Sequence, residues 1–180
     1  MDSRRRLLEF LREISFTRGR VRLSSGKMSD YYLDVRKTSL DPEGINLIGE
    51  VLWEELSPLP IDAVGGPESG AIPLVTIVAA LSQGRGKPLR AFFVRKEAKS
   101  HGMMRRIEGR LNPGDKVAII EDVVTTGATT LSAIKAVEEE GCQVVKIITL
   151  VDRREGGGEF LKEHGYHLDH IFSRDDFLRE

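Results

Sequence analysis

The stretch VAIIEDVVTTGATTLSAIKAVEEEGCQVVKIITLV, residues 117–151, decides the fold. It opens with a short apolar run at residues 117–120, which we expect to be a buried strand. Residues 128–140 then carry apolar side chains at helical spacing, and Gly141 is well placed as the C-terminal cap of that helix. The nearly continuous apolar run at residues 144–151 predicts an interior strand of a parallel sheet. Strand, helix and strand in this order form one βαβ unit.

The same alternation continues on both sides of this unit. We expect strands at residues 62–66, 89–94 and 168–172 and helices at residues 72–81 and 160–164. Strands that alternate with helices predict a doubly wound α/β fold, and 180 residues suit a single domain, residues 1–180. In such sheets ligands bind outside the carboxyl ends of the strands, so the loops at residues 65–70, 95–110 and 121–130 are the candidate site.

The first 40 residues do not follow this alternation. Asp2 or Ser3 can cap a first helix, and two short strands are expected at residues 21–23 and 31–35, around a turn at residues 24–26. Asp41 followed by Pro42 then opens another helix. We therefore expect a small N-terminal segment, about residues 1–40, beside the sheet.

Composition excludes several classes of protein. Apolar residues make up 40% and charged residues 31%, as in ordinary globular proteins, and the longest apolar runs are too short to span a membrane. We read no signal peptide. The net charge of −1 argues against a nucleic-acid partner. The single cysteine, Cys142, cannot form an internal disulfide, which fits a reducing cytoplasm.

Residues 121–130, EDVVTTGATT, have the character of a phosphate site. The turn and the new helix present free N–H groups and the positive end of the helix dipole, and Gly127 lets a ligand approach the backbone. Glu121 and Asp122 would repel a phosphate but could accept hydrogen bonds from a sugar diol. A capped helix alone is the simpler interpretation, but four threonines, a glycine and two acids exceed what a cap needs.

This segment resembles the phosphoribosyl pyrophosphate signature of type I phosphoribosyltransferases. The resemblance implies that Glu121 and Asp122 hold the ribose hydroxyls, with Asp122 counted among the catalytic residues. It also implies that the following turn holds the 5-phosphate, through Val123, Val124, Thr125, Thr126, Gly127, Ala128, Thr129 and Thr130.

A second motif, RKEAKSHG at residues 95–102, opens a basic loop of residues 95–109 that ends at Gly109. A solvated surface loop is the usual explanation of such a run. Its order, however, resembles the catalytic loop of orotate phosphoribosyltransferases, which reaches across a dimer into the neighbouring active site. The resemblance implies a homodimer. It also assigns contacts with pyrophosphate or its precursor to Arg95, Lys96, Lys99 and His101, with Lys99 the catalytic cation.

Two further segments resemble the same family. In SSGKMSDYY, residues 24–32, Lys27 would meet either substrate, while Tyr31 and Tyr32 could flank the base or could be ordinary strand residues. After the strand at residues 144–151, Arg153 would bind the orotate carboxylate as a bidentate fork, and Arg154 is the adjacent alternative. Thr126 is also assigned to the orotate side.

The loop at residues 65–70 looks like the pyrophosphate loop of the family. Its backbone N–H groups could bind pyrophosphate oxygens, although a tight strand-to-helix turn would look the same. The best-known branch of the family has a tyrosine and a lysine where this chain has Glu68 and Ser69, so a cation is missing.

Taken together, the resemblance spans nearly the whole chain and implies a type I phosphoribosyltransferase fold with a hood-like N-terminal segment. It implies transfer of a phosphoribosyl group from phosphoribosyl pyrophosphate to orotate in pyrimidine synthesis. Mg²⁺ would be bound through the substrate, with no direct protein ligand. A phosphoribosyltransferase for a purine or another base, and a regulator that senses phosphoribosyl pyrophosphate, remain the alternatives.

Overall fold

A computed structural model describes residues 2–22, 28–97 and 106–178. The strands of its main sheet are β3 (Ala63–Pro67), β4 (Arg90–Val94), β5 (Ile107–Gly109), β6 (Lys116–Val124), β7 (Gln143–Asp152) and β8 (Asp169–Ser173). Within the described residues they lie in the order β5-β4-β3-β6-β7-β8. All neighbours are parallel except β4 and β5, which pair antiparallel at one edge. The expected α/β sheet, mostly parallel, is confirmed.

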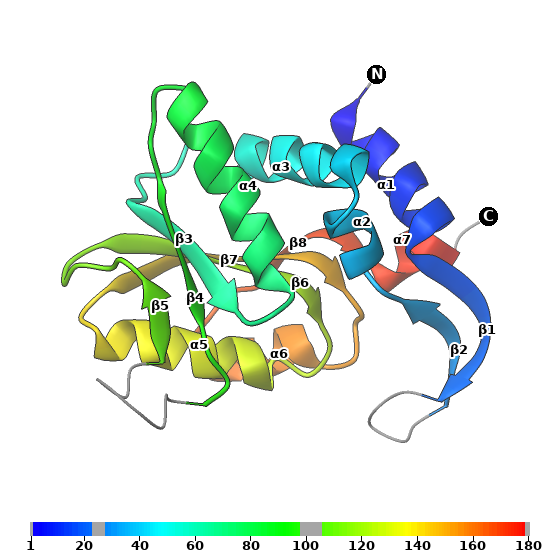
Figure 1. Ribbon diagram of the computed structural model, residues 1–180. Coiled ribbons are helices and arrows are strands. Elements are labelled where there is room, and N and C mark those ends of the chain that lie inside the picture. Colours follow the sequence, from blue (N-terminus) through cyan, green and yellow to red (C-terminus); the bar gives the residue numbers. More distant parts are fainter. Residues whose placement is uncertain (1, 23–27, 98–105, 179–180) are drawn as a thin grey trace.

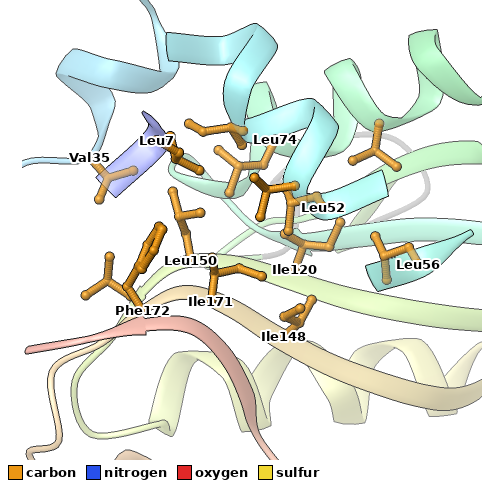
Figure 2. Packing of buried hydrophobic residues seen from close by; sticks show 14 of the residues in the cluster. Leu7, Val35, Leu52, Leu56, Leu74, Ile120, Ile148, Leu150, Ile171 and Phe172 are labelled. Carbon is orange, nitrogen blue, oxygen red and sulfur yellow. The ribbon is translucent and has the colours of Figure 1, made fainter. Parts of the chain in front are cut away.

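Helices cover both faces of the sheet (Figure 1). One face carries α1 (Ser3–Ile14), α3 (Pro42–Leu56) and α4 (Ala71–Gly84), and the other carries α5 (Ala128–Glu139) and α6 (Gly157–Glu163). The first core joins Leu7, Leu52 and Leu74 to Ile120 and Leu150 of the sheet, as Figure 2 shows. The second core packs α5 and α6 against the opposite side chains of β6. Each fully buried leucine or isoleucine contributes about 1.5–3 kcal/mol.

The N-terminal segment is fixed to the end of the sheet by aromatic packing. Its hairpin consists of β1 (Phe16–Arg22) and β2 (Met28–Leu33), followed by the short helix α2 (Arg36–Ser39). The Phe16 ring lies 5.8 Å from the ring of Tyr31 and 5.6 Å from that of Phe177, measured between centroids. Phe177 belongs to α7 (Arg174–Leu178), which directly follows β8. The hairpin therefore projects beside the carboxyl ends of β7 and β8 (Figure 1).

Several predicted boundaries were wrong. β6 continues past residue 120 to Val124, so Glu121 and Asp122 lie within the strand rather than after it. The cause is tertiary, because β7 is long enough to pair with β6 as far as Val124 and Asp152. β1 begins earlier than expected, at Phe16. The expected turn at residues 24–26 lies outside the described residues.

The basic loop is shorter than the sequence indicated. Residues 107–109 form β5, an edge strand whose Ile107 pairs with Val94 and whose Gly109 pairs with Phe92. Three residues are too few to show a periodicity, so only the pairing with β4 makes this segment a strand.

Among the residues that the structure describes, we find no helix with the length and apolar character of a transmembrane span.

Close approach of two strands requires a glycine at position 66. A Cβ atom built on Gly66 would lie 1.9 Å from the backbone oxygen of Ile120 in β6. Backbone oxygen atoms of a central strand cannot move aside as flexible side chains do. The β3–β6 contact, and with it the placement of the loop after β3, therefore depends on this residue.

We expect Gly66→Ala to lower the free energy of unfolding by about 1–3 kcal/mol or more, the usual cost of overpacking. Gly84→Ala is the matched control, because a Cβ there meets nothing within 4 Å and lies at the end of α4. That change should be neutral or stabilise by up to about 1 kcal/mol. Urea unfolding measures both, and equal stabilities of the two variants would contradict the packing argument.

Candidate active site

Three loops meet at the carboxyl edge of the sheet. They follow β3, β6 and β7, and short hydrogen bonds join them to neighbouring strand ends. The N–H of Glu68 donates to the oxygen of Val94 at 2.9 Å, and the N–H of Arg153 donates to that of Val124 at 3.0 Å. The loops that the sequence predicts for the site, at residues 65–70, 95–110 and 121–130, lie at the ends of β3, β4 and β6 as far as the structure describes them. The loop after β7 adds a fourth segment to this edge.

The turn after β6 leads into α5 through Gly127, which has a φ of 80°. A Cβ on Gly127 would lie 2.9 Å from the oxygen of Gly157, so the start of α6 packs directly on this turn. No side chain of the described residues caps α5. The threonines are therefore not used as caps, and the first N–H groups of α5 remain available for an anion.

The threonines of this turn differ in exposure. Thr126 and Thr129 are exposed and Thr125 is half-buried, so their hydroxyl groups can reach a ligand. Thr130 is only 1% exposed, and its hydroxyl donates a hydrogen bond to the carboxylate of Glu121. A phosphate in this turn would therefore contact the backbone N–H of Thr130 rather than its hydroxyl.

The two acids of β6 point to opposite faces of the sheet, as successive strand residues must. Glu121 lies under α5 and is buried, and burial raises its pKa to about 7. Asp122 lies beside Gly70, where a Cβ would come within 2.3 Å of its carboxylate carbon. Burial also raises the pKa of Asp122, and the nearby Arg36 guanidinium opposes that shift. Asp122 is partly exposed and is the carboxylate that a sugar hydroxyl could reach.

Arg153 and Arg154 take different positions after β7. Arg153 is 8% exposed, and its guanidinium carbon lies 5.0 Å from the centroid of the Tyr31 ring. Its Nε donates to Glu155 Oε1 at 2.9 Å. Arg154, which has a φ of 51°, turns outward to Asp175 with an N–O distance of 3.8 Å. Of the two arginines, Arg153 lies beside the hairpin residue expected near the base.

The two tyrosines also differ. Tyr31 is buried between Phe16 and Arg153, whereas Tyr32, on the other side of β2, is half-buried. Burial raises the pKa of the Tyr31 hydroxyl, which keeps it neutral.

Both ends of the basic loop are tied to the rest of the site. We call Arg95, Lys96 and Arg106 the neck of the loop. Arg106 donates to the oxygen of Arg95 at 3.2 Å and to Ser132 Oγ of α5 at 2.9 Å. The N–H of Lys96 donates to Glu68 Oε1 at 2.9 Å. Glu68, where the best-known branch of the family carries no acid, thus links the loop after β3 to the neck.

A cleft of about 280 Å³ lies between the neck and α5, and Pro67, Lys96 and Thr129 are part of its lining. Arg95 also lines it and lies 3.8 Å from Glu108, measured between Nη1 and Oε1.

Three of the predicted site residues, Lys27, Lys99 and His101, lie outside the described residues. Within the described ranges, no group of three or more His, Cys, Asp or Glu side chains could hold a metal ion.

Ser132 and Glu155 were not singled out as site residues from the sequence and are recognised by their contacts with Arg106 and Arg153. Gly70 and Arg106 belong to the predicted loops, but only the structure shows their contacts with Asp122 and Arg95. The proximity of Glu155 to Arg153 in the chain was the one available signal, and it does not reveal which way either side chain points.

The raised pKa of Glu121 makes stability depend on pH. The folded protein binds the proton of the Glu121 carboxyl group more tightly than the unfolded chain does. The free energy of unfolding therefore falls as pH rises from 4.5 towards 7. A difference of about 2.5 pKa units corresponds to a loss on the order of 3 kcal/mol. Glu121→Gln should therefore stabilise the fold more at pH 8 than at pH 5, as measured by urea unfolding. An equal effect of the substitution at both pH values would contradict this.

Comparison with known proteins identifies the family. Residues 42–164 match the model of the phosphoribosyl transferase domain family. The chain is 46% identical over 180 residues to the orotate phosphoribosyltransferase of Sorangium cellulosum, covering 98% of this chain and 94% of that protein.

Solved structures give the same result. The crystal structure of Mycobacterium tuberculosis H37Rv orotate phosphoribosyltransferase with Fe(III) dicitrate superposes with a TM-score of 0.85 at 38% identity, covering 97% of this chain and 98% of that one. The structure of the same enzyme with 5-phospho-alpha-D-ribosyl 1-diphosphate has a TM-score of 0.82 at 33% identity, covering 98% and 99%. A domain match over most of the chain, identity above 40% and a shared fold together make this chain a member of the orotate phosphoribosyltransferase family of type I phosphoribosyltransferases.

Proposed function

We propose that this protein transfers the 5-phosphoribosyl group from phosphoribosyl pyrophosphate to orotate. The products are orotidine 5′-monophosphate and pyrophosphate, in de novo UMP synthesis. Its relatives bear the name of this activity, and the Mycobacterium tuberculosis relative binds phosphoribosyl pyrophosphate.

Arg153 is the residue that selects orotate over other bases. Its guanidinium is buried at the carboxyl edge of β7, and its Nη2 has no hydrogen-bond partner among the described residues. A buried cationic donor without a partner costs free energy, and a substrate carboxylate supplies the strongest partner available. Orotate has that carboxylate, whereas uracil and purine bases do not. Because Tyr31 already packs on Arg153, we propose that Tyr32 is the ring that flanks the base.

The turn after β6 is the proposed site of the 5-phosphate. Thr126 and Thr129 are exposed, and the first N–H groups of α5 have no side-chain cap among the described residues, so this turn offers several donors to an anion. The positive end of the helix dipole adds to their attraction for an anion. Asp122, the partly exposed acid of β6, is then placed to accept a hydrogen bond from a ribose hydroxyl.

In the reaction a ring nitrogen of orotate loses its proton and forms a bond to the anomeric carbon, while the bond from that carbon to pyrophosphate breaks, with inversion. The pyrophosphate that leaves, or solvent, takes up the proton. The transition state resembles an oxocarbenium ion, so no nucleophilic side chain is needed. The protein contributes positioning and charge stabilisation. Arg95 and Lys96 begin the basic loop at the edge of the cleft, and with Lys99 and His101 they would balance the charge that develops on pyrophosphate.

Mg²⁺ is the proposed cofactor, and when bound it would neutralise charge on the pyrophosphate. This ion prefers oxygen ligands and keeps several waters. The partly exposed carboxylate of Asp122 could accept hydrogen bonds from waters bound to the ion. One acid in that role fits an ion held through substrate oxygens.

We also propose a homodimer in which the basic loop serves the neighbouring site, and a single domain that spans residues 1–180 with its substrate segment in about the first 40. The dimer rests on the resemblance of residues 95–102 to the family loop. A cytoplasmic location is consistent with the lone Cys142.

Turnover of orotate tests the activity. With phosphoribosyl pyrophosphate and Mg²⁺, we expect rapid loss of orotate absorbance and no transfer to uracil, adenine or guanine. Lys99→Ala should lower kcat by about 100-fold or more, the usual cost of removing one stabilising charge or donor. Lys162→Ala, which removes an exposed cation from α6, should leave kcat unchanged. Transfer to a purine, or binding without turnover, would replace this function by a purine enzyme or a sensor.

Mixing two inactive variants tests the shared site. Lys99→Ala removes the loop cation, and Asp122→Asn removes the ribose carboxylate. If the loop acts across the dimer, half of the sites in each mixed dimer are intact, and a statistical mixture regains about a quarter of wild-type activity. Differently tagged copies verify that mixed dimers have formed. Mixed dimers without activity would show that each loop serves its own subunit.

A further inference from the structure

Arg153 is held on two sides by this chain. The Tyr31 ring lies against the guanidinium, 5.0 Å from its carbon, and Glu155 accepts a hydrogen bond from Nε at 2.9 Å. The arginine side chain is 10% exposed and the glutamate side chain 31% exposed. One face and one edge of the guanidinium are thus occupied, while Nη2 is buried without a hydrogen-bond partner in the described part of the chain.

The backbone is shaped to produce this contact. Arg154 has a φ of 51° and is the one non-glycine residue with positive φ in the described ranges. This conformation is unfavourable for residues with a Cβ and persists only where its surroundings fix it. The N–H of Arg154 donates to Asp152 Oδ1 at 2.8 Å, and its side chain turns outward to Asp175. The turn directs the Arg154 side chain away from the site, and the side chains of Arg153 and Glu155 contact each other.

We propose that Glu155 is a positioning residue that sets the specificity for a carboxylate-bearing base. Fixing Nε fixes the plane of the guanidinium, because the group is rigid and planar. Nη2 is then held ready for the substrate carboxylate before binding. This inference rests on the proposed function, because it assumes that Arg153 receives orotate.

A competing role for the same contact predicts the opposite change in orotate binding when Glu155 is removed. The Glu155 carboxylate could occupy Arg153 in place of the substrate carboxylate until the substrate displaces it. The hydrogen bond to Nε argues against this, because Nη2, the donor that a carboxylate stand-in would use, has no partner in the described ranges. Positioning predicts that removal of Glu155 weakens orotate binding, and competition predicts that removal strengthens it.

Kinetics of Glu155→Ala separate these roles. A freed arginine must be ordered on binding, which costs about 0.5–1.5 kcal/mol per side chain, so KM for orotate should rise roughly 2- to 10-fold. KM for phosphoribosyl pyrophosphate and kcat should change little. Glu155→Gln, which keeps an oxygen acceptor for Nε, should recover most of the loss. Glu163→Ala is the matched control, because it removes an exposed carboxylate from the far end of α6.

A double-mutant cycle shows whether Glu155 acts through Arg153. In an Arg153→Met background, Glu155→Ala should have no further effect on KM for orotate. An unchanged or lowered KM for orotate in Glu155→Ala, or an equal effect of this change with and without Arg153, would overturn the positioning role. The proposed function would still stand if the wild-type protein turns over orotate. Absence of that wild-type turnover would overturn both.

Discussion

The pairing of β6 with β7 is the constraint on which the site depends. It runs from Lys116 and Gln143 to Val124 and Asp152, and the Arg153 N–H extends it to the oxygen of Val124. Because both strands end at the same level, the turn after β6 and the turn after β7 lie side by side. The contact of Gly127 with Gly157 then brings the proposed phosphate turn within reach of the arginine loop.

Ionisable groups are buried at this edge at a cost in stability. Glu121 is buried under α5, and its raised pKa shows that the folded state disfavours its charged form. Its hydrogen bond with Thr130 holds the first turn of α5 against the end of β6. Arg153 is likewise buried, and its Nη2 has no hydrogen-bond partner among the described residues. Buried polar groups without partners destabilise a fold.

Placement of the basic loop illustrates how distant segments combine. Near its start the N–H of Lys96 donates a hydrogen bond to Glu68 after β3, and Arg106, its last described residue, donates to Ser132 on α5. The loop after β3 and the phosphate helix are thereby joined to the neck of the basic loop. A glutamate at position 68 has a clear structural role here, although the sequence suggested only that a cation was missing.

The sequence by itself determined the fold class, the edge of the sheet where a candidate site is expected and the chemical character of residues 121–130. These follow from local patterns: apolar periodicity, helix caps, and donors grouped in one turn. It could not determine that Glu121 and Asp122 face opposite layers, that residues 107–109 form a strand, or which arginine turns inward. Each of those depends on contact with a distant segment: β7 pairs with the extended end of β6, β4 pairs with β5, and the Tyr31 ring packs on Arg153. Tertiary contacts decide such features because the free energy that selects them comes from residues far away in the chain.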